Sequence, residues 1–323
     1  MKHSKEIGGY LEMERYHGSL YHDNAVLLNC GRGCLNYLIE LYRIKEIWLP
    51  DYLCESVEEQ CRVDNVKVER YEIGANFQPK WETIAANEGY LYLVDYFGSL
   101  CEETIDNALD LFSGRVVVDE TQGFFRFPRS GVATLYTTRK YFGVSDGGFV
   151  YVDHPLERAL EKDESRTRMN YLLGRFERSA SEFFSKAQEN NEAVSVGYAR
   201  EMSAITENIL RSLKYEEIIA KRESNYQYLE KVLSPLNLLE LKMPIGPFAY
   251  PFLVKNGPAA RTLLAAQRIY IPTLWPNVVK DPNVGETARE YARNILPLPV
   301  DQRYDVEDMQ LIVDMMLSEG IIL

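Results

Sequence analysis

The first 119 residues alternate short apolar runs with segments whose apolar residues recur at helical spacing. The expected strands are residues 25–29, 46–49, 66–73, 89–95 and 115–119. The expected helices are residues 33–43, 56–63, 81–86 and 103–112. Strands that are apolar along almost their whole length are typical of a mostly parallel sheet covered by helices on both faces. The rhythm therefore predicts an α/β fold.

The rhythm changes after Asp119. Two β-rich runs, 132–136 and 149–152, have no helix between them, so antiparallel neighbours are expected. Long helical patterns follow at 155–190 and 199–233. A smaller mixed part then predicts strands at 248–254 and 295–298 and helices at 258–267 and 306–318. Prolines and glycines near residue 245 predict a boundary between a large domain, 1–240, and a small α+β domain, 241–323.

Composition narrows the function classes. The 323 residues carry a formal net charge of −12, which lacks the cationic field that attracts nucleic acid or anionic lipid. The sequence contains neither a signal-peptide pattern nor an apolar run long enough to span a bilayer. Its five cysteines do not have zinc-ligand spacing, so a metal site is not predicted. A cytoplasmic protein that binds neither nucleic acid nor membrane is expected.

A glycine-containing loop, NCGRGC, joins the first expected strand to the first helix. Gly31 and Gly33 allow close approach of the backbone, and free N–H groups at a helix start favour an anion such as a phosphate. The pattern also matches an incomplete dinucleotide fingerprint that lacks its third glycine, with Asp51 twenty residues after Gly31. Three interpretations stay open at this point: a cofactor phosphate, a dinucleotide, or a turn without ligand.

Asp119 and Lys140 narrow the choice. Asp119 ends an apolar strand, and Lys140 lies in a glycine-rich loop between two expected strands. Pyridoxal 5′-phosphate (PLP) chemistry needs a lysine amine for the Schiff base, an acid facing the pyridinium nitrogen and an anion site for the phosphate. The chain offers all three near the carboxyl ends of expected strands, where α/β sheets bind ligands.

Several segments also resemble a known family. The chain resembles the DegT/DnrJ/EryC1/StrS group of PLP-dependent sugar aminotransferases, and more closely a shorter DegT-like branch of it. The resemblance runs from about residue 7 to the C-terminus and is carried by IGGYLEM, LLNCGRGCL, IWLPDYLC, VDYFG, VVDETQ, TTRKYFGVSDGGFVYV, IYIPTLWP and LPLPVDQRYDVEDM. VVDETQ and RKYFGVSDGG together are its most specific parts.

The resemblance implies a fold and a set of roles. The fold would be that of the fold-type-I PLP transferases, a mixed, mostly parallel seven-stranded sheet between helices with a smaller C-terminal α+β domain. Lys140 would hold PLP as a Schiff base and move the proton in catalysis. Asp119 would pair with the pyridinium nitrogen, and Gln122 would hydrogen-bond the ring hydroxyl.

The resemblance also implies how the rest of the cofactor is held. Gly31 and Arg32 would supply backbone donors to the phosphate, and Thr137 would add a hydroxyl. The segment around Cys54 would cover one face of the ring, where the family often has an aromatic residue; Tyr52 could take that place instead. The family's asparagine segment, which reaches the phosphate from the partner subunit, has no clear match in this chain.

The sequence leaves two interpretations open for each of two further residues, Arg303 and Trp275. Arg303 could bind a substrate carboxylate, since arginine suits bidentate carboxylate recognition, or it could pair with Asp301 or Asp305. Trp275 could line the substrate pocket or pack in the core.

The expected function is amino transfer from an amino acid to a keto-sugar or to a similar small carbonyl compound. The resemblance implies a nucleotide-linked keto-sugar and a setting in sugar biosynthesis. A homodimer is implied by the resemblance. The alternatives are a PLP-fold protein that has lost catalysis and serves in binding or regulation, and a Rossmann-type NAD-dependent oxidoreductase. The family's sugar dehydratases replace the Schiff-base lysine, so Lys140 favours amino transfer over dehydration.

Overall fold

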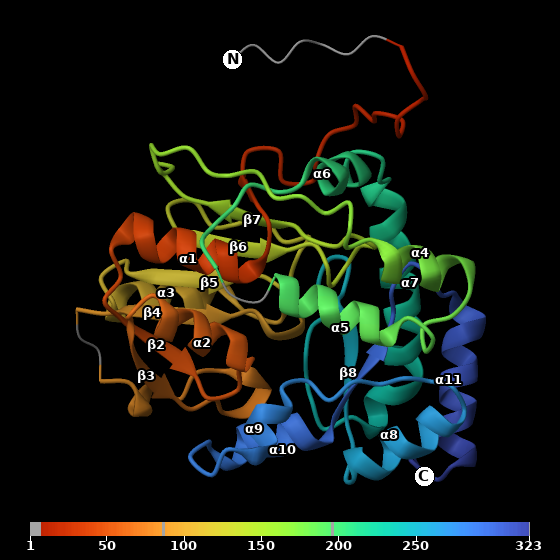
Figure 1. Cartoon of the computed structure of the whole chain (residues 1–323). Helices are drawn as coiled ribbons and strands as arrows, with labels where there is room; N and C mark the ends of the chain where they lie inside the picture. The colour runs from red at the N-terminus through yellow and green to blue at the C-terminus, as the bar shows by residue number, and fades with distance from the viewer. Residues whose placement is uncertain (1–7, 86–87, 195–196, 323) are drawn as a thin grey trace.

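The large sheet confirms the predicted α/β architecture (Figure 1). The computed structural model describes residues 8–85, 88–194 and 197–322. The strands of the sheet are β1 (Val26–Leu28), β2 (Glu46–Pro50), β3 (Lys67–Tyr71), β4 (Tyr90–Val94), β5 (Val116–Asp119), β6 (Ala133–Thr137) and β7 (Gly148–Tyr151). Their order is β1-β7-β6-β5-β4-β2-β3. The five strands from β6 to β3 are parallel, and β7 is antiparallel to both of its neighbours, as the missing helix between β6 and β7 predicts.

Helices connect and cover these strands. The helices of the first half are α1 (Gly31–Tyr42), α2 (Glu55–Val63) and α3 (Glu102–Leu111). The helices between the sheet and the C-terminal part are α4 (Asn170–Glu177), α5 (Phe184–Ala193), α6 (Ala204–Leu210) and α7 (Tyr215–Leu233). The central strand β5 is buried along its whole length, which explains its uninterrupted valines.

The C-terminal part forms a second, smaller layer. It contains the antiparallel strands β8 (Ala249–Leu253) and β9 (Ile295–Pro299) and the helices α8 (Gly257–Ala266), α9 (Pro276–Lys280), α10 (Glu286–Asn294) and α11 (Val306–Ser318). Its apolar core also takes Tyr226, Leu229 and Leu233 from the second half of α7, which lies against α11 (Figure 1). The helix α7 packs against both the part that contains the large sheet and the C-terminal part. The domain boundary at residue 240 stays a prediction.

Two helical expectations were wrong. Residues 81–86 were expected to form a helix, but only a single 3₁₀ turn forms, at Trp81–Thr83, and residue 86 lies outside the described residues. The long helix expected at 155–190 is instead an irregular stretch followed by the two short helices α4 and α5. Within that stretch Asp163 accepts from the backbone N–H of Glu164 and binds Arg168 at 2.7 Å. Such local side-chain bonds compete with helix formation.

A buried histidine makes the fold sensitive to acid. His22 is fully buried, its Nε2 lies 2.7 Å from the carbonyl oxygen of Phe124, and its Nδ1 lies 3.1 Å from the hydroxyl of Tyr151. Burial lowers the pKa of His22 to about 4, and the hydrogen bond to Phe124 offsets only part of this effect. The imidazole is therefore neutral in the folded protein at neutral pH.

This pKa predicts a loss of stability between about pH 6.5 and pH 4. In that range the unfolded chain binds a proton at His22 that the folded chain does not, so stability falls as the pH is lowered. At pH 5 the loss is about 2 kcal/mol. Denaturant unfolding at pH 7.5 and pH 5 should show His22→Gln, whose amide does not titrate, losing about 2 kcal/mol less than the wild type between the two pH values. An equal loss in both proteins would contradict the assignment.

Candidate active site

The ends of β4, β5 and β6 bring the predicted cofactor residues to one edge of the sheet. Residue Val94 is paired with Asp119, and Asp119 is paired with Leu135, so the loops that follow these parallel strands lie side by side. The Nζ of Lys140 donates a hydrogen bond to the hydroxyl of Thr121 at 3.3 Å. The structure therefore brings the acid that ends β5 and the lysine that follows β6 close together.

Asp119 is held as a buried hydrogen-bond acceptor. The hydroxyl of Tyr92 donates to its Oδ2 at 2.8 Å, and the backbone N–H of Thr121 donates to its Oδ1 at 2.8 Å. Both donors stabilise the negative charge of the carboxylate and fix its orientation. Each oxygen has a second lone pair, so Asp119 can still accept from a ligand.

Lys140 combines solvent access with a lowered pKa. Solvent reaches its side chain, yet protein atoms surround the amine on enough sides that desolvation lowers its pKa, while the negative charge of Asp119 opposes the shift. The amine also lies 5.7 Å from the centre of the Phe248 ring. A lysine with a lowered pKa is more often neutral and hence a better nucleophile toward an aldehyde.

Gln122 presents a buried donor without a protein partner. Its side chain is 1% exposed, and its Oε1 accepts from the backbone N–H of Phe97 at 2.8 Å. In the described part of the chain its Nε2 has no acceptor. An unsatisfied buried donor costs about 1–3 kcal/mol, so this amide fits a ligand that supplies an acceptor.

The start of α1 brings together the residues of the predicted anion site. Cys30 caps the helix by accepting from the N–H of Gly33 at 3.3 Å, and no acidic residue occupies the first turn. A Cβ at Gly31 would lie 2.7 Å from the methyl group of Thr137, so only glycine lets Thr137 come this close. The helix N-terminus, Gly31 and Thr137 are therefore together, as predicted.

Arg32, in the first turn of α1, and Arg139 both donate to Asn191. The Nη2 of Arg32 donates to the carbonyl oxygen of Asn191 at 3.4 Å, and Arg139 donates to the side-chain oxygen of the same asparagine. Among the described residues neither arginine forms an ion pair, and the Nε of Arg139 is buried without an acceptor. Arg32 was predicted only as a backbone donor. Arg139 was missed, and its position beside Lys140 is the signal that could have indicated it.

A pair of buried carboxyl groups, also missed, lies next to these residues. Asp95 follows β4, and Glu120 follows Asp119; Arg126 lies 3.7 Å and 3.8 Å from their oxygens. Burial raises the pKa of both groups, and the neighbouring Asp95 raises the pKa of Glu120 further. One shared proton allows the two groups to hydrogen-bond. The pair ties the ends of β4 and β5 together beside the loop that carries Gln122.

The two candidates for covering a ring differ in accessibility. Cys54 precedes α2, is half-buried, and its Sγ lies 3.1 Å from the hydroxyl oxygen of Ser56. Tyr52 is fully buried and packs edge-on against Trp275 at 4.4 Å between ring centres, so it does not take the place of the aromatic cover. The same contact places Trp275 in the core rather than in an open pocket.

Arg303 is occupied by a neighbour. Its Nε and Nη2 donate to the two oxygens of Asp301 at 2.6 Å and 2.8 Å. This bidentate ion pair is the pairing with Asp301 that the sequence leaves open as the alternative to a substrate carboxylate. A substrate carboxylate would have to compete with Asp301 for this guanidinium.

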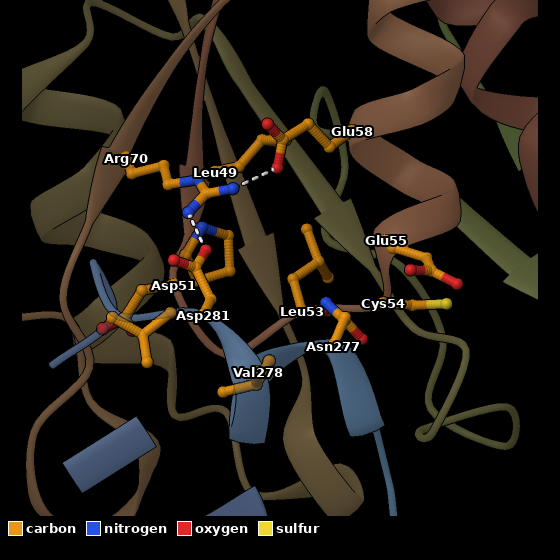
Figure 2. Close-up of a pocket in the computed structure, with 12 residues that line it drawn as sticks. Leu49, Asp51, Leu53, Cys54, Glu55, Glu58, Arg70, Asn277, Val278 and Asp281 are labelled. Atoms are coloured by element: carbon orange, nitrogen blue, oxygen red, sulfur yellow. Dashed lines mark hydrogen bonds and ion pairs between the residues drawn. The ribbon is translucent and has the colours of Figure 1, made fainter. Parts of the chain in front are cut away.

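Asp51 and the pocket beside it do not fit a dinucleotide (Figure 2). The Oδ1 of Asp51 accepts from the N–H of Ile73 at 3.1 Å, and its Oδ2 accepts from the N–H of Gly285 at 2.8 Å. Figure 2 shows Arg70 in the same pocket held between Glu58 and Asp281, each at 2.6 Å. The cavity has a volume of only about 20 Å³, and its arginine is already paired with two carboxylates.

The sheet order argues against a dinucleotide in the same way. In a Rossmann unit the first strand lies inside a parallel sheet next to the second. Here β1 is the edge strand of the sheet, and its neighbouring strand β7 is antiparallel to it. The observed sheet order therefore contradicts the alternative of a Rossmann-type oxidoreductase.

Solved structures with the same architecture identify the fold of this chain. A DegT DnrJ EryC1 StrS aminotransferase from Brucella abortus superimposes with a TM-score of 0.66, covering 91% of this chain and 85% of its own at 12% identity. The chain has the fold of these aminotransferases. DesV of S. venezuelae, in complex with a ketimine intermediate, gives a TM-score of 0.67 at 16% identity and covers 93% of this chain and 85% of its own.

The same fold also occurs in a sugar dehydratase. The E. coli GDP-4-keto-6-deoxy-D-mannose-3-dehydratase with bound hydrated PLP matches at 14% identity, with a TM-score of 0.62 and coverage of 90% of this chain and 87% of its own. No family model and no curated protein sequence matches the chain. The predicted fold class is thus confirmed, and the choice between reactions on the aminotransferase fold depends on the residues of the site.

Proposed function

We propose that this protein is a PLP-dependent aminotransferase that moves an amino group from an amino acid to a keto-sugar or a similar small carbonyl compound. The observation that carries the proposal is the proximity of Lys140, Asp119 and Gln122. Among the described residues the Nε2 of Gln122 has no acceptor, the carboxylate of Asp119 is fixed by two donors, and the pKa of Lys140 is lowered. Bound PLP supplies an aldehyde for the amines and a ring that takes up the electron pair released at the substrate carbon.

Each residue has a separate task in this proposal. The Nζ of Lys140 holds the cofactor between turnovers and, once displaced by the amino donor, removes and returns a proton at the reacting carbon. Asp119 keeps the ring nitrogen protonated through its negative charge. Gln122 donates its free Nε2–H to the ring hydroxyl, and Cys54 covers one face of the ring.

The phosphate is held at the start of α1 in this proposal. The backbone at Gly31, the hydroxyl of Thr137 and the guanidinium groups of Arg32 and Arg139 would surround it. A helix N-terminus and two arginines that form no ion pair with the described carboxylates suit a dianion, because charge-assisted hydrogen bonds are about twice as strong as neutral ones. Both arginines donate to Asn191, which keeps the two guanidinium groups near each other.

Replacing Arg139 by Met is expected to weaken PLP binding about 10- to 100-fold, since a hydrogen bond to a charged group contributes about 1.5–3 kcal/mol. Binding of pyridoxal, which lacks the phosphate, should not change. Absorbance titration with both compounds measures this, and Arg166→Met, which alters an exposed arginine paired with Glu164, is the control. Equal weakening of PLP and pyridoxal would show that Arg139 does not bind the phosphate.

The nature of the acceptor rests on similar proteins and on Lys140. One protein of this fold, DesI, was solved in the presence of its TDP-sugar product, and it matches 91% of this chain at 11% identity. The presence of Lys140 favours amino transfer over the dehydration that another protein of this fold performs. We therefore propose a keto-sugar, in a nucleotide-linked form, as the acceptor, and sugar biosynthesis as the setting.

The test of this function separates the two half-reactions. The PLP-loaded protein is mixed with glutamate and other amino acids, and release of the matching keto acid is measured together with loss of the visible band of protein-bound PLP. Nucleotide-linked keto-sugars are then added, and mass spectrometry detects an amino-sugar. A product lighter by one water would instead show a dehydratase. Bound PLP without any donor reaction would show a protein that only binds the cofactor.

We also propose that the protein is a cytoplasmic homodimer. Large apolar side chains are exposed on the N-terminal arm and around α4 and α5, namely Tyr10, Leu11, Leu173, Phe176, Phe184 and Tyr198. A second copy that covers such a surface would remove it from water. Within the described residues no helix is both long and apolar enough to cross a membrane. Sedimentation of the PLP-loaded protein as a stable monomer would contradict the dimer.

A further inference from the structure

Arg222 is a charged side chain in a fully buried position. It lies on α7, is 0% exposed, and within the described residues it forms no ion pair with a carboxylate. Burial lowers the pKa of its guanidinium. Burying a charge without an opposite charge is costly, so such a residue persists where its hydrogen bonds have a specific use.

The hydrogen bonds of Arg222 converge on the residue that follows Lys140. Its Nη2 donates to the carbonyl oxygen of Tyr141 at 3.1 Å, and its guanidinium lies 4.6 Å from the centre of the Tyr141 ring. Gln302 donates to the same carbonyl oxygen at 2.8 Å and accepts from the Nε of Arg222 at 2.8 Å. Three segments distant in sequence thus form a closed triangle of hydrogen bonds.

A third donor of Arg222 binds the backbone just before Phe248. Its Nη1 donates to the carbonyl oxygen of Pro247 at 2.8 Å. The next residue is Phe248, whose ring lies against the amine of Lys140. Arg222 therefore holds both the backbone beside Lys140 and the segment that carries the ring facing its amine.

We propose that Arg222 and Gln302 are positioning residues that fix Lys140 for proton transfer at the substrate carbon. The inference rests on the proposed function, in which Lys140 is the base. A base must lie within hydrogen-bond reach of the proton it moves, and a displacement of about 1 Å can cost about 100-fold in rate. Because Gln302 follows β9 and Arg222 lies on α7, the small sheet and α7 together set the position of the lysine.

Gln302→Leu is the main test because Gln302 is only half-buried and its loss leaves Arg222 in place. Arg222→Lys is the second variant. Gln267→Leu is the matched control, since Gln267 is exposed and loses one side-chain hydrogen bond, to Glu319, far from Lys140 in the fold. For each protein the PLP affinity, the melting temperature, and the maximal rate and half-saturation of the amino-donor half-reaction are measured.

We expect Gln302→Leu to lower the maximal half-reaction rate about 10-fold or more, with PLP affinity and donor half-saturation within about threefold of the wild type. Arg222→Lys should act in the same direction, and Gln267→Leu should match the wild type. A wild-type maximal rate in folded Gln302→Leu, with or without a lower melting temperature, would overturn the positioning role alone. A wild type that shows neither a visible PLP band nor a half-reaction would overturn the proposed function and this inference with it.

Discussion

Lys140→Ala is expected to lower amino transfer by at least about 10³-fold, because the variant lacks both the amine that binds the cofactor aldehyde and the base that moves the proton. PLP should still associate through its phosphate, since the start of α1, Arg32 and Arg139 are unchanged. The visible band of the protein-bound cofactor should shift toward that of free PLP. Single-turnover kinetics with an amino donor measure the loss.

The control for this variant is Lys162→Ala. Lys162 is exposed, and its contact with Glu207 at 3.8 Å is a surface ion pair, which contributes little to stability. Its rate and spectrum should match the wild type. Full activity of Lys140→Ala would remove Lys140 from the mechanism.

Asp119→Asn is expected to lower the rate about 10²- to 10³-fold while PLP stays bound to Lys140. The amide can still accept from Thr121 or Tyr92, so the loop should keep its shape. The negative charge facing the ring nitrogen is lost, however, and a fixed charge in a site shielded from water contributes strongly to catalysis. The visible spectrum and the half-reaction rate are both measured, because the account predicts a retained band with a slow reaction.

Asp51→Asn provides the matched comparison. Asp51 is also a buried aspartate at the end of a strand, and it also accepts two hydrogen bonds, although both of its donors are backbone N–H groups. The PLP account predicts a rate close to that of the wild type for Asp51→Asn. A large loss at Asp51 together with no loss at Asp119 would reverse the assignment of the acidic residue.

The large sheet could be predicted because its strands are buried on both faces. The apolar runs that became β4 and β5 leave few alternatives, and the acid that ends β5 marks the carboxyl edge where ligands bind. The short link between β6 and β7 also indicated their antiparallel pairing. These features follow from local sequence, so they needed no knowledge of distant contacts.

The errors in secondary structure have a common physical origin. Residues 81–86 and 155–190 show apolar spacing compatible with a helix, but the pattern does not reveal competing hydrogen bonds. Thr83, for example, accepts from the N–H of Glu72 and donates to the carbonyl oxygen of Lys80, which ends the turn. Contacts of this kind join residues that are separated in sequence, and they decide whether a helix continues.

The missed site residues depend on tertiary contacts as well. Arg139 is one of many arginines in the sequence, and only the fold shows that it meets Arg32 at Asn191 without a carboxylate partner among the described residues. Arg222 is eighty-two residues from Lys140, and only the fold brings it to the Tyr141 carbonyl. Tyr52 was considered as a ring cover from its position in sequence, but it is buried against Trp275. The sequence alone does not show where these side chains point or whether they are buried.

The most direct measurement of the central claim is borohydride reduction of the PLP-loaded wild-type protein, followed by peptide mapping. The account predicts a visible band that borohydride removes and a single pyridoxyl group attached to Lys140. Lys80, which is engaged by Glu72 at 2.8 Å, should carry no label. A protein that binds no PLP, or a label spread over surface lysines with none on Lys140, would contradict the account.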